Sequence, residues 1–219
     1  MRLFSLDKRL STIAEMIPEG AKVWDVGSDH ARLPVWLVAT GKVPCAVASD
    51  IGEMPLESAK RTVERFGVED RVSLRLCDGI PEDACGAADL FVIAGMGGST
   101  IAEILERAPW TQEKGVRLIL QPMSSPEDLR KVLYEGRYYV LSETYVKDGG
   151  RRYVIIETEG GGEAESFDRA DLAAGKHIRD EEHIRRSIER LTNELAGADE
   201  SVKIELNASI EKLEKLLEE

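Results

Sequence analysis

The sequence predicts an α/β fold, a doubly wound parallel sheet that ends in an antiparallel β-hairpin and is followed by an α-helical coiled-coil hairpin. Strand-length apolar runs alternate with helix-length amphipathic runs as far as residue 135, which is typical of a parallel sheet with helices on both faces. Two strand-like runs, 138–146 and 152–158, then follow one another across a short turn that contains glycine. Beyond residue 180, apolar residues repeat at 4-3-4 spacing in two runs, which indicates paired helices.

The individual elements follow from periodicity and from the residues that end them. Leu6, Leu10 and Ile13 recur at helical spacing, and Pro18 stops that helix. A later helix has Pro55 near its start and Gly67 just after its end, as helices prefer. Strands are expected at residues 23–26, 44–49, 71–77, 88–94 and 116–121, and helices at residues 6–17, 33–37, 55–66, 99–107 and 126–135.

The first strand runs into a single glycine, Gly27, and then directly into a helix. Nucleotide-like ligands bind at such turns, because the backbone donors at a helix start face the crevice beyond the strand ends. A dinucleotide site would need G-x-G-x-x-G, whereas here Asp25 and Asp29 flank one glycine. An acidic loop suits an amine or a sulfonium better than phosphates, and the ligand we infer is S-adenosylmethionine.

Five β/α units closed by an antiparallel hairpin are the layout of class I methyltransferases. An ordinary Rossmann dehydrogenase has no such hairpin and carries the glycine fingerprint that this loop lacks. An NAD-dependent oxidoreductase is therefore the less favoured alternative.

The C-terminal quarter of the chain is expected to be helical. Glu159-Gly-Gly-Gly-Glu163 is interpreted as a linker, so we expect a cofactor-binding domain at residues 1–160 and a helical coiled-coil domain at residues 161–219. Its two helices are centred on residues 184–195 and 206–217, with a short turn between them. The pattern leaves open whether they pack on the main domain or form a separate arm.

The amino-acid composition limits the kinds of partner that we expect for this protein. The net charge of −12 argues against wholesale nucleic-acid binding, although basic residues gather locally, among them Arg9, Arg32, Arg130/Lys131, Arg137 and Lys147/Arg151/Arg152. Apolar runs are far shorter than a membrane span, and the first residues become charged too early for a signal peptide. Three cysteines without C-x-x-C spacing predict neither disulfides nor zinc. We therefore expect a cytoplasmic protein that needs no metal and no membrane.

Carboxylates lie at the ends of three predicted strands. Asp50 ends the second strand, where α/β folds place an acid for ribose hydroxyls, although it could instead cap the next helix. Asp78 and Gly79 follow the third strand and could receive the adenine amino group, or form an ordinary turn. Asp25 lies inside a buried strand, where a carboxylate needs a partner such as the methionine amine.

The substrate side is expected around the fourth and fifth strands. The turn Gly95-Met96-Gly97-Gly98 stands where amine-directed methyltransferases carry Asn/Asp-Pro-Pro-Tyr, so methylation of such an amine is disfavoured. Asp29 and His30 face the same crevice from the helix start, and Gln121-Pro122 ends the fifth strand. His177 and His183 are interpreted as surface residues of the tail.

Several motifs together resemble the bacterial TrmK family. They are Leu6-Asp-Lys-Arg-Leu10, Asp25-Val-Gly-Ser-Asp-His-Ala-Arg-Leu-Pro34, Ser58-Ala-Lys60, Asp78-Gly79, Ile93-Ala-Gly-Met-Gly-Gly98 and Leu118-Ile-Leu-Gln-Pro122. The resemblance covers residues 5–158 in family order and implies a tRNA adenosine-22 N1-methyltransferase that uses S-adenosylmethionine and carries a C-terminal helical domain. One departure is Ser49-Asp50, where the family often has Gly-Glu; the carboxylate is retained but is one methylene shorter.

The expected chemistry needs little acid–base help. Neutral adenine has a lone pair on N1, so catalysis can rest on positioning and electrostatics. A carboxylate would stabilise the cationic product or take its amino proton. We assign that role to Asp29, with His30 beside it. Since a folded tRNA hides its base edges, the adenosine must be extruded.

The expected site residues fall into three groups. The catalytic residues are Asp29 and His30. The cofactor-binding residues are Arg9, Asp25, Gly27, Ser28, Asp50, Ile51, Asp78, Gly79, Ala94, Gly95, Met96 and Gly97. The substrate-binding residues are Arg9, Arg32, Gln121 and Pro122, with the basic residues after the fifth strand as further phosphate contacts. Tight tRNA binding is not expected of an acidic chain. The sequence leaves the oligomeric state open, with a monomer as the favoured form. Methylation of a small molecule or another RNA site, and a non-catalytic cofactor-binding scaffold, are the alternatives.

Overall fold

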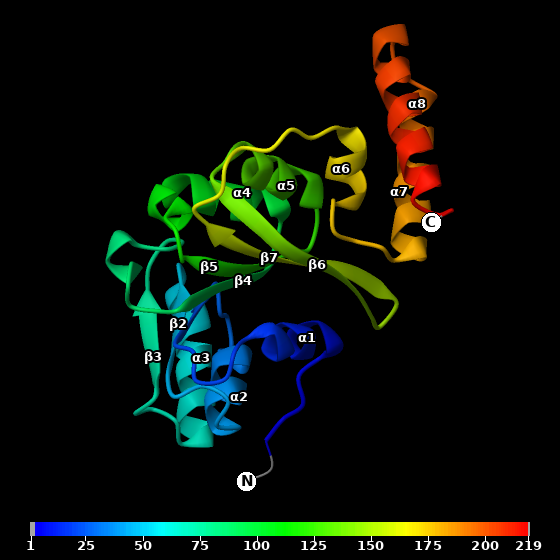
Figure 1. Ribbon diagram of the computed structural model, residues 1–219. Helices are drawn as coiled ribbons and strands as arrows, with labels where there is room; N and C mark the ends of the chain where they lie inside the picture. The colour runs from blue at the N-terminus through cyan, green and yellow to red at the C-terminus, as the bar shows by residue number, and fades with distance from the viewer. Residues whose placement is uncertain (1–2, 219) are drawn as a thin grey trace.

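The computed structural model describes residues 3–218 and confirms the expected fold (Figure 1). Seven strands form one sheet in the order β3-β2-β1-β4-β5-β7-β6, in which β7 runs antiparallel to both of its neighbours and the other pairs are parallel. The strands are β1 (Val23–Val26), β2 (Ala46–Asp50), β3 (Val72–Leu76), β4 (Leu90–Met96), β5 (Arg117–Pro122), β6 (Tyr138–Asp148) and β7 (Arg151–Gly160). The strand order reverses direction at β1, so a crevice opens at the carboxyl ends of β1 and β4.

Helices cover both faces of this sheet. They are α1 (Lys8–Met16), α2 (Arg32–Ala39), α3 (Glu53–Phe66), α4 (Gly98–Arg107) and α5 (Pro126–Glu135). Side chains of α1–α3 pack with Val23 and Val92 in one apolar cluster, whereas side chains of α4 and α5 pack with Trp24 and Phe91 in a second. Because neighbouring strand residues point to opposite faces, these clusters are the two cores of a three-layer domain.

The closing hairpin is longer than expected. β6 extends to Asp148 and β7 begins at Arg151, so only Gly149 and Gly150 form the turn. Their φ angles of +54° and +77° suit a two-residue hairpin turn, which requires the left-handed region at both positions. The flanking residues that were expected in the loop therefore belong to the strands.

The glycine run before the tail is not a flexible linker, and that prediction is wrong. Gly160 is the last residue of β7. A Cβ on Gly160 would stand 2.3 Å from the carbonyl oxygen of Glu113, and one on Gly162 would stand 2.4 Å from the carbonyl carbon of Tyr138. These glycines serve close backbone packing, which composition alone does not distinguish from flexibility.

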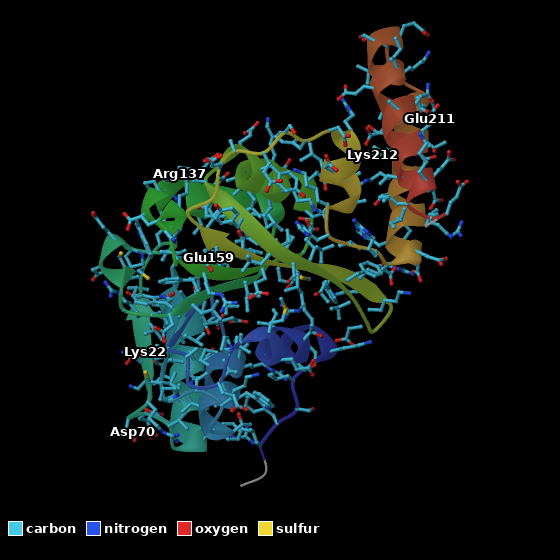
Figure 2. All side chains as sticks on the ribbon, in the orientation of Figure 1. Lys22, Asp70, Arg137, Glu159, Glu211 and Lys212 are labelled. Carbon is cyan, nitrogen blue, oxygen red and sulfur yellow. The ribbon has the colours of Figure 1, made fainter. Side chains whose placement is uncertain are left out.

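The tail, described as far as residue 218, contains three helices, α6 (Arg169–Ala174), α7 (Glu181–Leu195) and α8 (Glu200–Lys215), of which α6 was not expected. They share a third apolar cluster that includes Ile184, Leu191 and Leu206. Lys212 of α8, labelled in Figure 2, pairs with Asp168 and Asp171 at the start of α6 at 2.8 and 2.7 Å. The helix α8 packs against both α7 and α6, and Figure 1 shows α7 and α8 beyond α6 as seen from the sheet.

A fully buried arginine joins the tail to the sheet domain. Arg130 of α5 pairs with buried Glu143 of β6 at 2.8 Å, and its guanidinium also donates to the carbonyl oxygens of Leu172 and Ala173 in α6. The expectation that Arg130 contacts RNA phosphate is therefore wrong, because its side chain has no exposed surface. The tail is docked through α6 and α7 rather than free.

His177 is exposed as expected, but His183 is not. A ring nitrogen of His183 lies 3.0 Å from the carbonyl oxygen of Ala174, and its ring packs on Tyr145. Burial, with help from the charge of Arg130, lowers the pKa of His183 to about 4, so this side chain is neutral at physiological pH. None of the helices within residues 3–218 has the length and apolar character needed to cross a bilayer.

Candidate active site

The loop between β1 and α2 forms the centre of the crevice. The expected glycine turn between the strand and the helix is longer than a single residue, because residues 27–31 form it before α2 begins. Gly27 has φ +69°, and Asp29 and Ala31 also adopt left-handed backbone at +47° and +50°. Such conformations are costly for residues with a Cβ and cluster at functional sites. The side chains of Asp29 and His30 are exposed at the mouth of the crevice.

Asp25 lies beneath this loop as a buried carboxylate. Its residue is 6% exposed, and the Ser28 hydroxyl donates a short hydrogen bond to it. Burial raises the pKa of Asp25 to about 7, while the Ser28 hydrogen bond and the charge of Arg9 oppose this rise and the charge of Asp50 adds to it. No cation bonds to Asp25 among residues 3–218, so this carboxylate is suited to a positively charged ligand group.

Arg9 reaches the crevice from α1. One of its guanidinium nitrogens donates to Gln121 at 2.7 Å, and the guanidinium lies over the ring of Tyr153. Gln121 is fully buried and also donates to the carbonyl oxygen of Pro122. Its side chain therefore lies behind Arg9 and positions it, rather than lining the cavity as a substrate contact.

One cavity, of about 280 Å³, opens above Asp25 and is called here the loop cavity. It is lined by Arg9, Leu10, Asp25, Gly27, Ser28, Asp29, His30, Arg32, Leu33, Ala94, Gly95 and Met123. Most of the residues expected at the methyl-donor and substrate side are thus brought together. His30 lies 3.4 Å from the Asp29 carboxylate, and both side chains are more than half exposed.

A second cavity, of about 240 Å³, lies at the carboxyl ends of β2 and β3 and is called here the strand-end cavity. It is lined by Val26, Gly27, Asp50, Ile51, Cys77, Asp78, Gly79, Met96, Thr100, Ile104 and Arg107. Gly27 lines both cavities, and the side chain of Met96 packs on it so closely that a Cβ on Gly27 would stand 1.9 Å from the Met96 methyl. The two cavities therefore adjoin across Gly27.

Asp50 is positioned by the backbone that follows it. Its carboxylate accepts from the Gly52 N–H at 2.9 Å and, more weakly, from the Asp29 N–H at 3.3 Å. The helix-cap alternative is not observed, because Gly52 is the N-cap of α3. Beside it Ile51 is 69% exposed, which leaves an apolar surface next to the carboxylate.

Asp78 carries a partner that sequence reasoning missed. Arg107 of α4 donates two hydrogen bonds to its carboxylate, at 2.5 and 3.0 Å, and holds the pKa of Asp78 below its usual range. Arg107 itself lines the strand-end cavity. Nothing local in the sequence connects Arg107 with a turn 29 residues earlier.

The glycine turn after β4 begins later than expected. The strand continues through Met96, with a register irregularity between Ala94 and Met96, and Gly95 adopts φ +91°. Gly97 is the N-cap of α4. A bulge of this kind re-aims the backbone next to a site.

The donor set fits S-adenosylmethionine. The loop cavity offers a buried carboxylate with a raised pKa and a nearby guanidinium, Arg9, which match the ammonium and carboxylate of an amino acid. The strand-end cavity offers Asp50 for hydroxyls and the apolar side chains of Ile51 and Ile104 for a flat ring. Among residues 3–218, no three potential metal ligands come together.

Fold and site together define a class I methyltransferase. Residues 6–156 match the family described as "Methyltransferase domain". A Bacillus subtilis tRNA (adenine(22)-N(1))-methyltransferase is 41% identical over 175 residues, which cover 80% of this chain and 74% of that protein. The chain belongs to this tRNA (adenine(22)-N(1))-methyltransferase family, so the resemblance to TrmK is confirmed.

Solved structures agree. The crystal structure of the B. subtilis m1A22 tRNA methyltransferase TrmK is 33% identical with a TM-score of 0.80, covering 99% of each chain. A Streptococcus pneumoniae structure in complex with S-adenosyl-L-methionine is 30% identical with a TM-score of 0.81, covering 97% of this chain and 100% of that one. These findings confirm S-adenosylmethionine as the cofactor and overturn the oxidoreductase alternative.

Proposed function

We propose that this chain transfers a methyl group from S-adenosylmethionine to N1 of adenosine 22 in tRNA, with the two adjoining cavities as the cofactor site. Family membership over most of the chain supports the reaction. The observation that carries the site is the buried Asp25 carboxylate, which lies where the cofactor's ammonium group would be held. The cytoplasm, where tRNA is modified, is the proposed location, and a monomer is the proposed form.

Each cavity would hold one half of the cofactor. Asp25 and Arg9 would bind the amino acid half, Asp50 would accept hydrogen bonds from the ribose, and Ile51 and Gly79 would contact the adenine. Asp78 would reach the adenine amino group through the lone pairs that Arg107 does not use. The cofactor would supply an electrophilic methyl group on its sulfonium.

The protein's own part in the reaction is positioning and charge. The lone pair on adenine N1 needs no base before attack, so the loop cavity has only to orient the ring. Methylation leaves a positive charge on the base, and the carboxylate of Asp29 at the cavity mouth would stabilise it or accept a proton from the exocyclic nitrogen. His30, 3.4 Å away, would keep that carboxylate oriented.

A path for RNA leads away from this mouth. Met123 lines both the loop cavity and a groove of about 350 Å³ between the hairpin and α7. Tyr153, Arg152, Arg186 and Arg190 line the groove, and such a mixture of aromatic and guanidinium groups suits stacking and phosphate contact. The extruded adenosine would enter the loop cavity from this side.

The decisive experiment follows the labelled methyl group of S-adenosylmethionine into unmodified bacterial tRNA and identifies the product nucleoside by mass spectrometry. We expect N1-methyladenosine, which disappears when adenosine 22 is replaced. Asp29→Ala should lower kcat by about 100-fold or more.

The matched control is Asp70→Ala. Asp70 is an exposed acid between α3 and β3, at the opposite edge of the sheet from the strand ends (Figure 2). Its removal should leave turnover unchanged. Methylation of any other nucleotide would refute the reaction, and near-normal turnover of Asp29→Ala would refute the role of that residue alone.

A further inference from the structure

A third cavity, of about 380 Å³, lies on the other side of the catalytic loop. It is formed between the N-terminal segment, the loop and one face of α3. Its lining residues are Phe4, His30, Arg32, Arg61, Thr62, Arg65 and Phe66. Its volume falls within the range of pockets that hold small ligands, and none of the assigned cofactor groups requires it.

The charge of this cavity is opposite to that of the chain. Three arginines line it in a protein of net charge −12. Arg65 has no carboxylate within ion-pair distance among residues 3–218. Arg32 donates one hydrogen bond to the carbonyl oxygen of Ser5. Arg61 lies 3.8 Å from Glu57, but both side chains are exposed and such pairs are weak. Most guanidinium donors therefore remain available to an anion.

Aromatic rings form the apolar part of the same cavity. Phe4 and Phe66 pack edge to face with centroids 5.1 Å apart. The guanidinium of Arg32 lies 5.2 Å from the Phe4 centroid, and that of Arg65 lies 5.7 Å from the Phe66 centroid. Planar cations over aromatic rings bind phosphates at their edges and stack bases on their faces. The cavity thus combines the two chemistries of a nucleotide.

The position of the cavity connects it with methyl transfer. His30 and Arg32 line both this cavity and the loop cavity. A nucleotide held here would therefore adjoin the base held next to Asp29. An extruded base leaves its neighbours on the RNA strand close to the cavity mouth, where their phosphates need a counter-charge.

We propose that this cavity is a second RNA subsite, which binds the nucleotide adjoining the target adenosine. Arg61 and Arg65 contact its phosphate, and the Arg32–Phe4 pair forms the stacking surface for its base. The proposal rests on the proposed function and names a further part of the substrate that the enzyme holds. A free phosphorylated nucleotide offers the same chemistry, so the test separates the two sources.

The test compares the double variant Arg61→Ala/Arg65→Ala with Lys60→Ala. Lys60 is on the same helix, carries the same charge and lies outside the cavity. We expect the KM for tRNA to rise about 10-fold or more in the double variant, and the dependence of tRNA binding on salt to become less steep by about one to two units of slope. The kcat, the affinity for S-adenosylmethionine and the melting temperature should change little. Lys60→Ala should behave as the wild type, and Arg65→Lys should retain part of the binding.

Three results would overturn the proposal. An unchanged KM for tRNA would do so, as would an equal rise in Lys60→Ala, which would mean only general surface charge. Competition by adenosine monophosphate that depends on Arg61 and Arg65, without any effect of these residues on tRNA, would assign the cavity to a free nucleotide. Direct binding of tRNA without cofactor distinguishes these failures from failure of the proposed function, since it requires no methyl transfer.

Discussion

The buried carboxylate of Asp25 should make the protein less stable as the pH rises. In the folded protein its pKa is about 7, whereas the ordinary value of 3.8 applies to the unfolded chain. Between these two values the folded state binds more protons than the unfolded state, so the free energy of unfolding falls with increasing pH. The destabilisation is absent when the pH is below the pKa of the unfolded chain and complete when the pH is above the pKa of the folded protein.

The magnitude follows from the size of the shift. A difference of roughly three pKa units corresponds to about 4 kcal/mol in full, of which about 3 kcal/mol develops between pH 5 and pH 8. Asp25→Asn has nearly the same shape, keeps an oxygen for the Ser28 hydroxyl and does not titrate. The stability of this variant relative to the wild type should therefore increase by about 3 kcal/mol between the two pH values.

Urea denaturation at pH 5, 6, 7 and 8 measures this difference directly, and any constant effect of the substitution cancels. The variant Asp70→Asn, at an exposed position, measures how much of the change in stability comes from the loss of one negative charge alone. S-adenosylmethionine should reduce the pH dependence of the wild type, because its ammonium group favours ionised Asp25. A wild-type-to-variant difference that stays constant across this range would refute the reasoning about burial.

Two further substitutions test the site and its support. Gly27→Ala places a methyl group on a residue with φ +69° and against the Met96 side chain. Titration calorimetry should show that this variant binds S-adenosylmethionine about 10-fold or more weakly. Unchanged binding would mean that the loop tolerates a Cβ. Arg130→Ala leaves Glu143 buried without its partner and should lower the free energy of unfolding, measured by urea denaturation, by about 3–5 kcal/mol. The double variant Arg130→Met/Glu143→Leu should recover much of this loss. If it does not, the carbonyl oxygens of α6 are the essential partners of Arg130.

The centre of the sheet was predictable because most residues of β1, β4 and β5 are buried, so that these strands form nearly continuous apolar runs. Element ends were less predictable, since backbone pairing rather than composition decides them. β4 continues through Gly95 and Met96 as a bulge, and the hairpin strands continue to its two glycines. Gly160 and Gly162 were misinterpreted because glycine serves both flexibility and close approach.

The acidic half of the candidate site was predictable from strand ends, since Asp25 and Asp50 lie near or at the end of a strand and Asp78 follows shortly after one. The basic half was not. Arg107 and Arg65 reach their cavities from helices whose facing is fixed only by tertiary packing. Arg130 and His183 were expected at the surface, because a basic residue on an amphipathic helix is ordinarily exposed, but the structure does not leave them exposed.

The buried Arg130 also bears on how this protein can be divided or recombined. Ending the chain after Gly160 would remove the carbonyl oxygens of Leu172 and Ala173 from the guanidinium and open its pair with Glu143 to water. We therefore expect the parts of the chain on either side of the boundary between residues 160 and 161 to unfold together rather than independently. Grafting the tail onto another catalytic domain would require Arg130 and Glu143 to be transferred with it. The tail helices and the sheet on which they pack therefore have to be kept together.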